Sequence, residues 1–195
     1  MNHMPMTRDE ALALLKSMPQ LESDMNHYLE TEAIMRALAE RFGEDAEYWG
    51  MLGLLHDVDW ALTKSDWTGH CVKAAEILKA KGFDHEFIEN VQSHGYGYAE
   101  IPSMAHKKRH SKIQHSLIAA ETLTGIIYAY ALMRGKRVTG MDAAGLKKKF
   151  KDKKFAASCR RDLVMEIEKT GLSLDEFFAL SINAVETIKE QIGLV

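Results

Sequence analysis

The chain has 195 residues, a hydrophobic fraction of 46% and a formal net charge of −3. These values suit one compact domain with an ordinary core, and the weak negative charge gives no sign of binding to a nucleic-acid polymer. The two cysteines, Cys71 and Cys159, fit neither a disulfide framework nor a paired-cysteine metal motif. No signal-peptide pattern is visible at the N-terminus, so we expect a cytoplasmic protein.

Helical periodicity runs through the chain, and no stretch sustains the alternation of apolar and polar residues that marks a strand. The pattern predicts helices over residues 8–17, 22–42, 45–56, 68–82, 85–95, 111–134 and 173–192. Pro19 stops the first helix, Gly43 ends the second, and Thr68 can cap the fourth.

The fold class predicted from these elements is all-α. We expect a single helical bundle over residues 1–135, with a helical extension over 136–195 packed on the same domain. Residues 95–110 are predicted to form a loop. The least polar long stretch, 117–133, is interrupted by Glu121 and is short for a membrane span, so no membrane is expected.

Polar side chains occupy inward positions on five of these helices. They are His27, His56, Asp57, His70, His94 and Glu121. A single histidine of this kind is usually a satisfied core residue, but a buried carboxylate without a partner is very costly. A divalent metal is the common partner that accepts both imidazole and carboxylate ligands.

The order of these residues resembles the HD superfamily of metal-dependent phosphohydrolases, and looks closest to the small uncharacterised HDIG-type hydrolases. The segments that carry the resemblance, in family order, are NHYLETEAIMRALA, GLLHDVDW, GHCVKAAEIL, VQSHG and AAETLTGIIYA. The resemblance implies an HD-type helical bundle with a metal site at its centre.

The resemblance also implies a set of ligands. His27, His56 and Asp57 would bind a first divalent ion, and Asp57 would bridge to a second ion held by His70 and His94. The ions would be iron, manganese, nickel, magnesium or zinc.

The last family ligand is normally aspartate, where this chain has Glu121. The longer side chain would either coordinate the ion from a backbone that lies further away, or act through the ligands without binding the ion itself.

The implied reaction is hydrolysis of a phosphate ester by a metal-activated hydroxide, with a nucleotide or small phosphomonoester as substrate. Two alternatives stay open: a di-iron oxygenase built in the same cage, and a non-catalytic nucleotide-binding module. A small phosphorylated substrate is the expected partner, and a homodimer is compatible with the sequence.

Other residues have a functional and a structural interpretation. Asp59 either orients a histidine or accepts a proton from the attacking water, or is a turn aspartate. Trp60 stands where the cyclic-dinucleotide branch often has lysine, and either stacks on a base or packs in the core. Lys148 and Lys149, in the lysine-rich segment 147–154, either hold the substrate phosphate or form a solvated face.

The basic cluster at residues 107–110 has the same two interpretations. His115 is predicted not to be a ligand, because it lies on a different helical face from Glu121. His3, His85 and His106 are expected at the surface.

Overall fold

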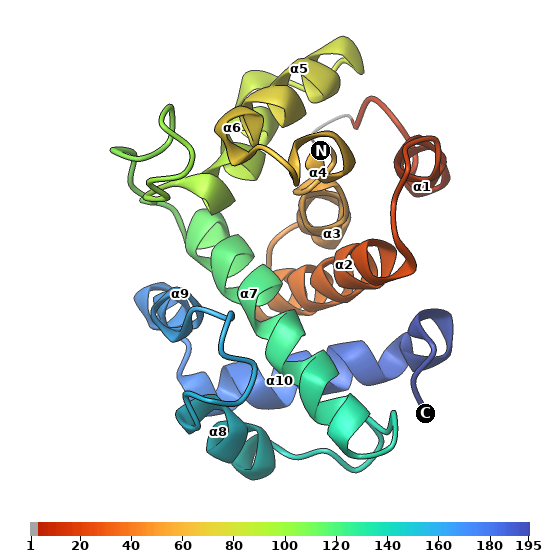
Figure 1. Cartoon of the computed structure of the whole chain (residues 1–195), viewed down its shortest axis with the longest axis vertical. Helices are drawn as coiled ribbons and strands as arrows, with labels where there is room; N and C mark the ends of the chain where they lie inside the picture. The colour runs from red at the N-terminus through yellow and green to blue at the C-terminus, as the bar shows by residue number, and fades with distance from the viewer. Residues whose placement is uncertain (1–3) are drawn as a thin grey trace.

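Residues 4–195 are described by the computed structural model, and within that range the regular structure is helical, with no strand. The predicted all-α class is therefore confirmed (Figure 1). His3 lies outside the described residues. In chain order the elements, with η marking a 3₁₀ turn, are α1 (Arg8–Lys16), α2 (Glu22–Phe42), α3 (Ala46–Leu55), α4 (Trp60–Thr63), η1 (Trp67–Gly69), α5 (Val72–Ala80), α6 (His85–Gln92), η2 (Ser93–Gly95), α7 (Lys112–Met133), α8 (Ala143–Lys151), α9 (Arg161–Val164), η3 (Met165–Thr170), α10 (Leu174–Thr187) and η4 (Lys189–Ile192).

Local capping explains why most helices begin and end where the sequence predicts. Gly43 ends α2 in the left-handed conformation, with φ of 71°. Ser111 and Gln114 form a capping box at the start of α7, and Ser173 with Glu176 forms another at the start of α10.

The predicted start of the fourth helix is wrong. Thr68 lies inside η1, where its N–H donates to the side chain of Asp66 at 3.0 Å. The α-helix α5 begins only after Cys71, whose φ is 65°. Its first N–H groups, from Cys71 and Ala74, donate to the carboxylate of Asp59. A carboxylate from an earlier turn therefore replaces the local cap, which no local pattern could indicate.

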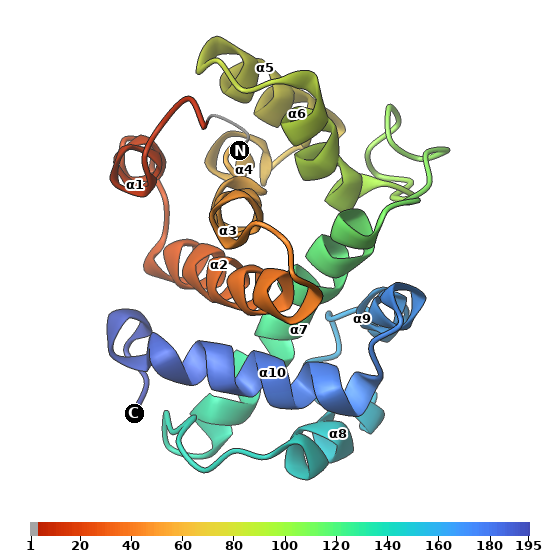
Figure 2. The ribbon, with the colours of Figure 1, turned by 180° about the vertical axis from the view of Figure 1, so that it is seen from behind.

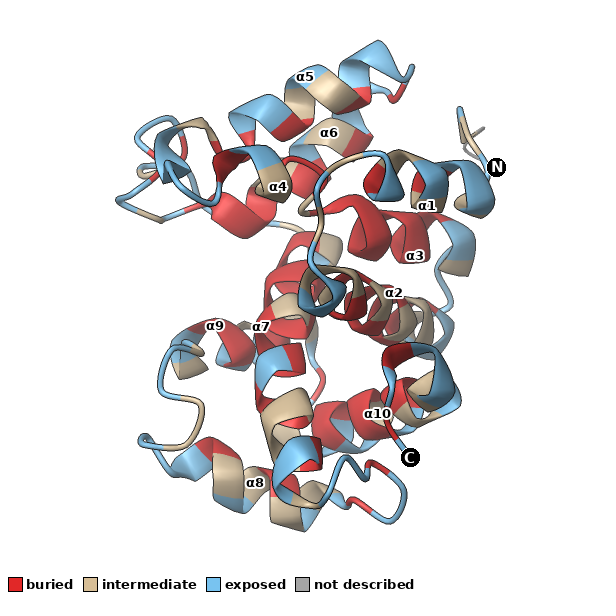
Figure 3. Ribbon diagram, turned by 45° about the vertical axis from the view of Figure 1, so that its right-hand side comes forward, coloured by how far each residue is buried: buried red, intermediate tan, exposed pale blue. Residues whose placement is uncertain are grey.

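The long helix α7 runs through the middle of the protein. In Figure 1 it has α2 and α3 on one side and α8 and α9 on the other, while α10 passes behind it. Among the described residues α7 is the one helix with the length and composition to cross a membrane, and 61% of its apolar window is buried inside the protein. Figure 3 shows buried residues over most of α3 and along α7, with exposed residues towards the C-terminal end of α7. The apolar character of α7 is therefore that of a core helix.

The C-terminal helices share the core of the rest of the chain. Phe177 and Phe178 of α10 are completely buried, in one apolar cluster with Leu38 of α2 and Leu123 of α7. Figure 2 shows α10 beside α2. Because one core serves both sides of the proposed boundary at residue 135, the division into two parts stays a prediction.

The helices α2 and α3 approach closely at Gly53. A Cβ placed on Gly53 would lie 2.8 Å from the backbone oxygen of Thr31 and 3.0 Å from the Cα of Glu32. Both neighbours are backbone atoms of α2, so no change of side-chain rotamer can move them away. A side chain at this position would therefore push α3 away from α2.

We predict that Gly53→Ala lowers the free energy of unfolding by about 1–3 kcal/mol, because the added methyl overpacks the α2–α3 contact. Chemical denaturation would measure the change. Gly69→Ala is the control, since the nearest neighbour of its Cβ would be a methyl of Thr63 at 3.7 Å. That variant should change stability by less than about 0.5 kcal/mol. Equal losses in both variants would contradict the close-approach argument.

Candidate metal centre

The end of α3 places a histidine and an aspartate at the centre of the fold. The apolar run of α3 buries its last turn, and His56 forms the C-cap of the helix. Its Nδ1–H donates to the carbonyl oxygen of Gly53 at 2.8 Å, so its Nε2 carries the free lone pair. Burial lowers the pKa of His56 to about 3. The imidazole is therefore neutral at pH 7, as a metal ligand must be.

His27 reaches the same place from α2. Its Nδ1 lies 2.8 Å from the hydroxyl oxygen of Thr124, and this hydroxyl donates its own hydrogen to the carbonyl of Glu121 at 2.6 Å. The hydroxyl can then only accept from His27, which fixes the proton on Nδ1. The Nε2 of His27 then carries a free lone pair, which can bind a metal ion.

His70 and His94 approach from the opposite side. The Nδ1–H of His70 donates to Oδ1 of Asp59 at 3.0 Å, and that of His94 donates to the carbonyl of Val91 at 2.6 Å. All four histidines are thus held by Nδ1 and turn Nε2 inward. This is the arrangement in which histidine binds a metal while its other nitrogen donates a hydrogen bond.

The four Nε2 atoms form two close pairs. Those of His27 and His56 are 3.1 Å apart, and those of His70 and His94 are 3.0 Å apart. Two nitrogen lone pairs at this separation repel unless a cation lies between them. Ligands on one ion with metal–nitrogen bonds of about 2.0–2.1 Å would be about 2.9–3.4 Å apart. The donor set therefore fits two metal positions.

Asp57 lies between the two pairs. Its Oδ2 is 3.9 Å from Nε2 of His27 and 3.6 Å from that of His56, while Oδ1 is 3.4 Å from Nε2 of His70 and 3.2 Å from that of His94. Burial opposes the charge, but the surrounding imidazoles outweigh it and hold the pKa of Asp57 well below its usual value. One carboxylate oxygen therefore faces each metal position.

Asp59 orients His70 from behind. Its Oδ1 accepts from His70, and its Oδ2 accepts from the N–H groups of Cys71 at 2.9 Å and Ala74 at 3.0 Å. The residue is completely buried. Burial opposes the positive form of His70, but the bond to Asp59 and the contacts with Cys71 and Asp57 raise its pKa to about 10, so an ion that binds at Nε2 would displace a proton. Asp59 thus has the geometry of the orienting residue.

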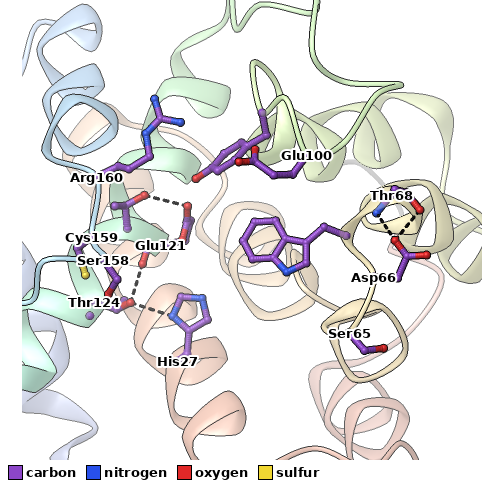
Figure 4. A pocket seen from close by; sticks show the side chains of 14 residues that line it. His27, Ser65, Asp66, Thr68, Glu100, Glu121, Thr124, Ser158, Cys159 and Arg160 are labelled. Carbon is purple, nitrogen blue, oxygen red and sulfur yellow. Dashed lines mark hydrogen bonds between the residues drawn. The ribbon is translucent and has the colours of Figure 1, made fainter.

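Glu121 stands apart from the two compact groups. These consist of His27, His56 and Asp57, and of His70, Cys71 and His94. The carboxylate of Glu121 instead accepts from the hydroxyl of Thr122 at 2.9 Å, and burial raises its pKa. In Figure 4 it lies beside His27 and Thr124 on one wall of a pocket. Its role as a ligand stays a prediction.

Two cavities open beside the cluster. The larger, of about 790 Å³, is lined by His27, Ser65, Asp66, Trp67, Thr68, Tyr98, Glu100, Glu121, Thr122, Thr124, Gly125, Ser158, Cys159 and Arg160 (Figure 4). The smaller, of about 250 Å³, is lined by Asp57, Trp60, Trp67, His70, His94, Gly95, Tyr98, Ile101 and Glu121. The two share Trp67, Tyr98 and Glu121, so a ligand in the larger cavity would adjoin the histidine cluster.

Trp60 is placed at the site, on the wall of the smaller cavity. Its ring meets that of Trp67 edge-on, with centroids 5.3 Å apart, and that of His70 at 5.4 Å. It is therefore partly packed and partly available to a ligand.

The two lysines predicted to bind phosphate lie elsewhere, on α8. Lys148 is exposed, and Lys149 stands over the rings of Tyr130 and Phe155. Neither lines the two cavities beside the cluster, whereas Arg160 does. The prediction missed Arg160 because it belongs to no basic run like that of residues 147–154, and only the fold brings it to the cavity.

In the basic cluster before α7, Arg109 serves the scaffold. Arg109 forms a two-pronged ion pair with Glu166 and donates to the carbonyls of Ser93 and Tyr96. The Nδ1 of His115 lies 2.7 Å from Glu166, away from the metal cluster. His85 and His106 are exposed, as expected.

Residues 25–114 match the family model described as the HD domain. This segment is therefore similar in sequence to HD domains. It contains the four histidines and Asp57, and it ends before Glu121. HD domains are typically metal-dependent hydrolases, which agrees with the donor set described above. A search of curated proteins and a search of solved structures gave no significant match.

We predict that Asp59→Asn lowers the affinity for an ion held by His70 and His94 by about 10–100-fold, because an amide orients the imidazole less strongly than a carboxylate. Competition with a chelating dye would measure the affinity. Asp84→Asn is the matched control, since Asp84 caps α6 by accepting from the Phe87 N–H at 2.8 Å and is not part of the cluster. An equal loss in both variants would assign the effect to helix capping alone.

Proposed function

We propose that this protein is a metal-dependent phosphohydrolase that uses two divalent ions to cleave a small phosphomonoester, with a nucleotide as the favoured substrate. The observation that carries the proposal is the position of Asp57, which offers one carboxylate oxygen to each histidine pair. A carboxylate shared in this way supports two adjacent ions rather than one.

The bound ions would supply positive charge for the phosphate oxygens and a water whose pKa is lowered towards about 7. The chain supplies the frame for this chemistry. Each histidine is held by a hydrogen bond at Nδ1, so little reorganisation is needed when a substrate binds. We assign Asp59 a positioning role rather than proton transfer, because both its oxygens are engaged behind His70.

The larger cavity supports recognition of a nucleotide-sized substrate. Trp67 and Tyr98 present aromatic surface on its wall, with ring centroids 6.3 Å apart. A base can stack on such rings. Arg160 lies on the same wall, with its guanidinium 5.2 Å from the centre of the Tyr98 ring. Its Nε and Nη2 bind Asp162, which leaves Nη1 for a phosphate oxygen.

We propose that the protein acts in the cytoplasm and is related to the small HDIG-type hydrolases. A homodimer is the assembly to test. The composition gives no sign of binding to a nucleic-acid polymer, so the proposed partner is a small phosphorylated molecule.

We predict that Asp57→Ala abolishes phosphate release and lowers the bound metal from two ions to at most one, because both positions lose a ligand. Metal analysis of the purified protein and phosphate release from a panel of phosphorylated metabolites would measure the two effects. The panel would be run with manganese, nickel, magnesium, iron and zinc.

Full activity in Asp57→Ala would reject the proposed site. Iron content with substrate-dependent oxygen uptake, and no phosphate release, would instead indicate the di-iron oxygenase that the same cage permits. Tight nucleotide binding by the unaltered protein without turnover would indicate a binding module.

We predict that Arg160→Ala raises KM about tenfold or more with little change in kcat, because a hydrogen bond from a charged group contributes about 1.5–3 kcal/mol in the ground state. Steady-state kinetics on the best substrate would test this. Lys148→Ala is the comparison, since Lys148 lines neither cavity. A raised KM in Lys148→Ala alone would move the phosphate site to the lysine segment.

A further inference from the structure

The thiol of Cys71 lies against the second histidine pair. Its Sγ is 3.6 Å from Nε2 of His94, and the ligand atoms of His70, Cys71 and His94 all lie within 4.8 Å of one another. The side chain is completely buried. The sequence suggested no role for this cysteine, since it belongs to no cysteine motif.

The backbone of Cys71 is held in a conformation that L-residues rarely adopt. Its φ is 65° and its ψ is −30°. The Cys71 N–H donates to Asp59, and the Cys71 carbonyl accepts from the side chain of Gln92 at 3.1 Å. Such strain persists where the surroundings fix it and is concentrated at functional sites. Here the surroundings that fix it include Asp59, the residue that orients His70.

The space for the sulfur is provided by a glycine. A Cβ on Gly95 would lie 2.5 Å from the Sγ of Cys71, and the φ of Gly95 is not positive, so space rather than backbone freedom requires glycine there. Gly95 directly follows His94. The same turn therefore presents one imidazole and makes room for the thiol beside it.

We propose that Cys71 binds the second metal ion as a thiolate, together with His70, His94 and Oδ1 of Asp57. Metal–sulfur and metal–nitrogen bonds of about 2.3 and 2.0–2.1 Å place two ligands of one tetrahedral ion about 3.5 Å apart. The observed 3.6 Å between sulfur and nitrogen fits this value. On binding, the thiol releases its proton to solvent and the sulfur lone pair forms the bond to the ion. The inference rests on the proposed metal centre but not on the phosphatase reaction.

The proposed ligand makes the two metal positions chemically different. The first is formed by nitrogen and carboxylate oxygen from His27, His56 and Asp57, whereas the second adds sulfur. Thiolate ligands favour zinc, iron or cobalt over magnesium and manganese. The second position should therefore retain a zinc-like ion in the presence of excess magnesium.

The test is a cobalt titration of the metal-depleted full-length protein, followed by absorption spectroscopy. A thiolate bound to cobalt gives a charge-transfer band in the near ultraviolet, which imidazole and carboxylate do not give. We expect this band in the unaltered protein and in Cys159→Ser, whose thiol is the matched control outside the two ligand groups. Cys71→Ser should lose the band, keep cobalt at the first position, and bind the second ion about 10–100-fold more weakly.

X-ray absorption of the unaltered protein loaded with zinc gives a second readout that needs no variant. A sulfur neighbour at about 2.3 Å supports the proposal, and its absence overturns it. Two bound cobalt ions without the band would leave the metal centre intact and return Cys71 to the small core that it shares with Tyr96, Ile101 and Met104. Failure to bind cobalt at all would overturn this inference and the proposed metal centre together. Phosphatase activity enters none of these outcomes.

Discussion

The candidate site depends on one negative charge, the largely buried carboxylate of Asp57, which four imidazole nitrogens surround. An isolated carboxylate in a protein interior is very costly, and imidazole nitrogens whose lone pairs face each other at 3.0–3.1 Å repel one another. Cations between the carboxylate and the nitrogens resolve both problems at once. The helices α2 and α3 bring the first pair of histidines to Asp57, and the turns beside α5 and α6 bring the second.

The hydrogen bonds that orient the histidines join residues that are close in the chain in two cases and further apart in the other two. His56 and His94 each donate to a carbonyl three residues earlier, so their orientation follows from their own helix ends. His27 depends on Thr124 of α7, and His70 depends on Asp59. Two of the four histidines are thus oriented by contacts that form only after the helices pack. The close approach of α2 and α3 also brings His27 on α2 next to His56 at the end of α3, so it matters for the site as well as for the core.

The segment that matches the HD domain contains the four histidines and Asp57, but the neighbouring cavity is completed by residues that follow it. Glu121 and Thr124 come from α7, and Arg160 comes from the turn before α9. The proposed chemistry rests on the matched segment. The proposed recognition of substrate uses Trp67 and Tyr98 of that segment together with Arg160, which lies outside the matched residues.

The sequence by itself determined the all-α class, the bounds of most helices and six inward polar residues, five of which the structure brings together, because helical periodicity, caps and inward-facing polar groups are local signals. Four of its failures have the same cause. The start of α5, the stacking of Lys149 on Tyr130 and the positions of Cys71 and Arg160 depend on residues distant in the chain. Only the tertiary structure decided these features, because a side chain acquires its partners when helices from different parts of the chain meet.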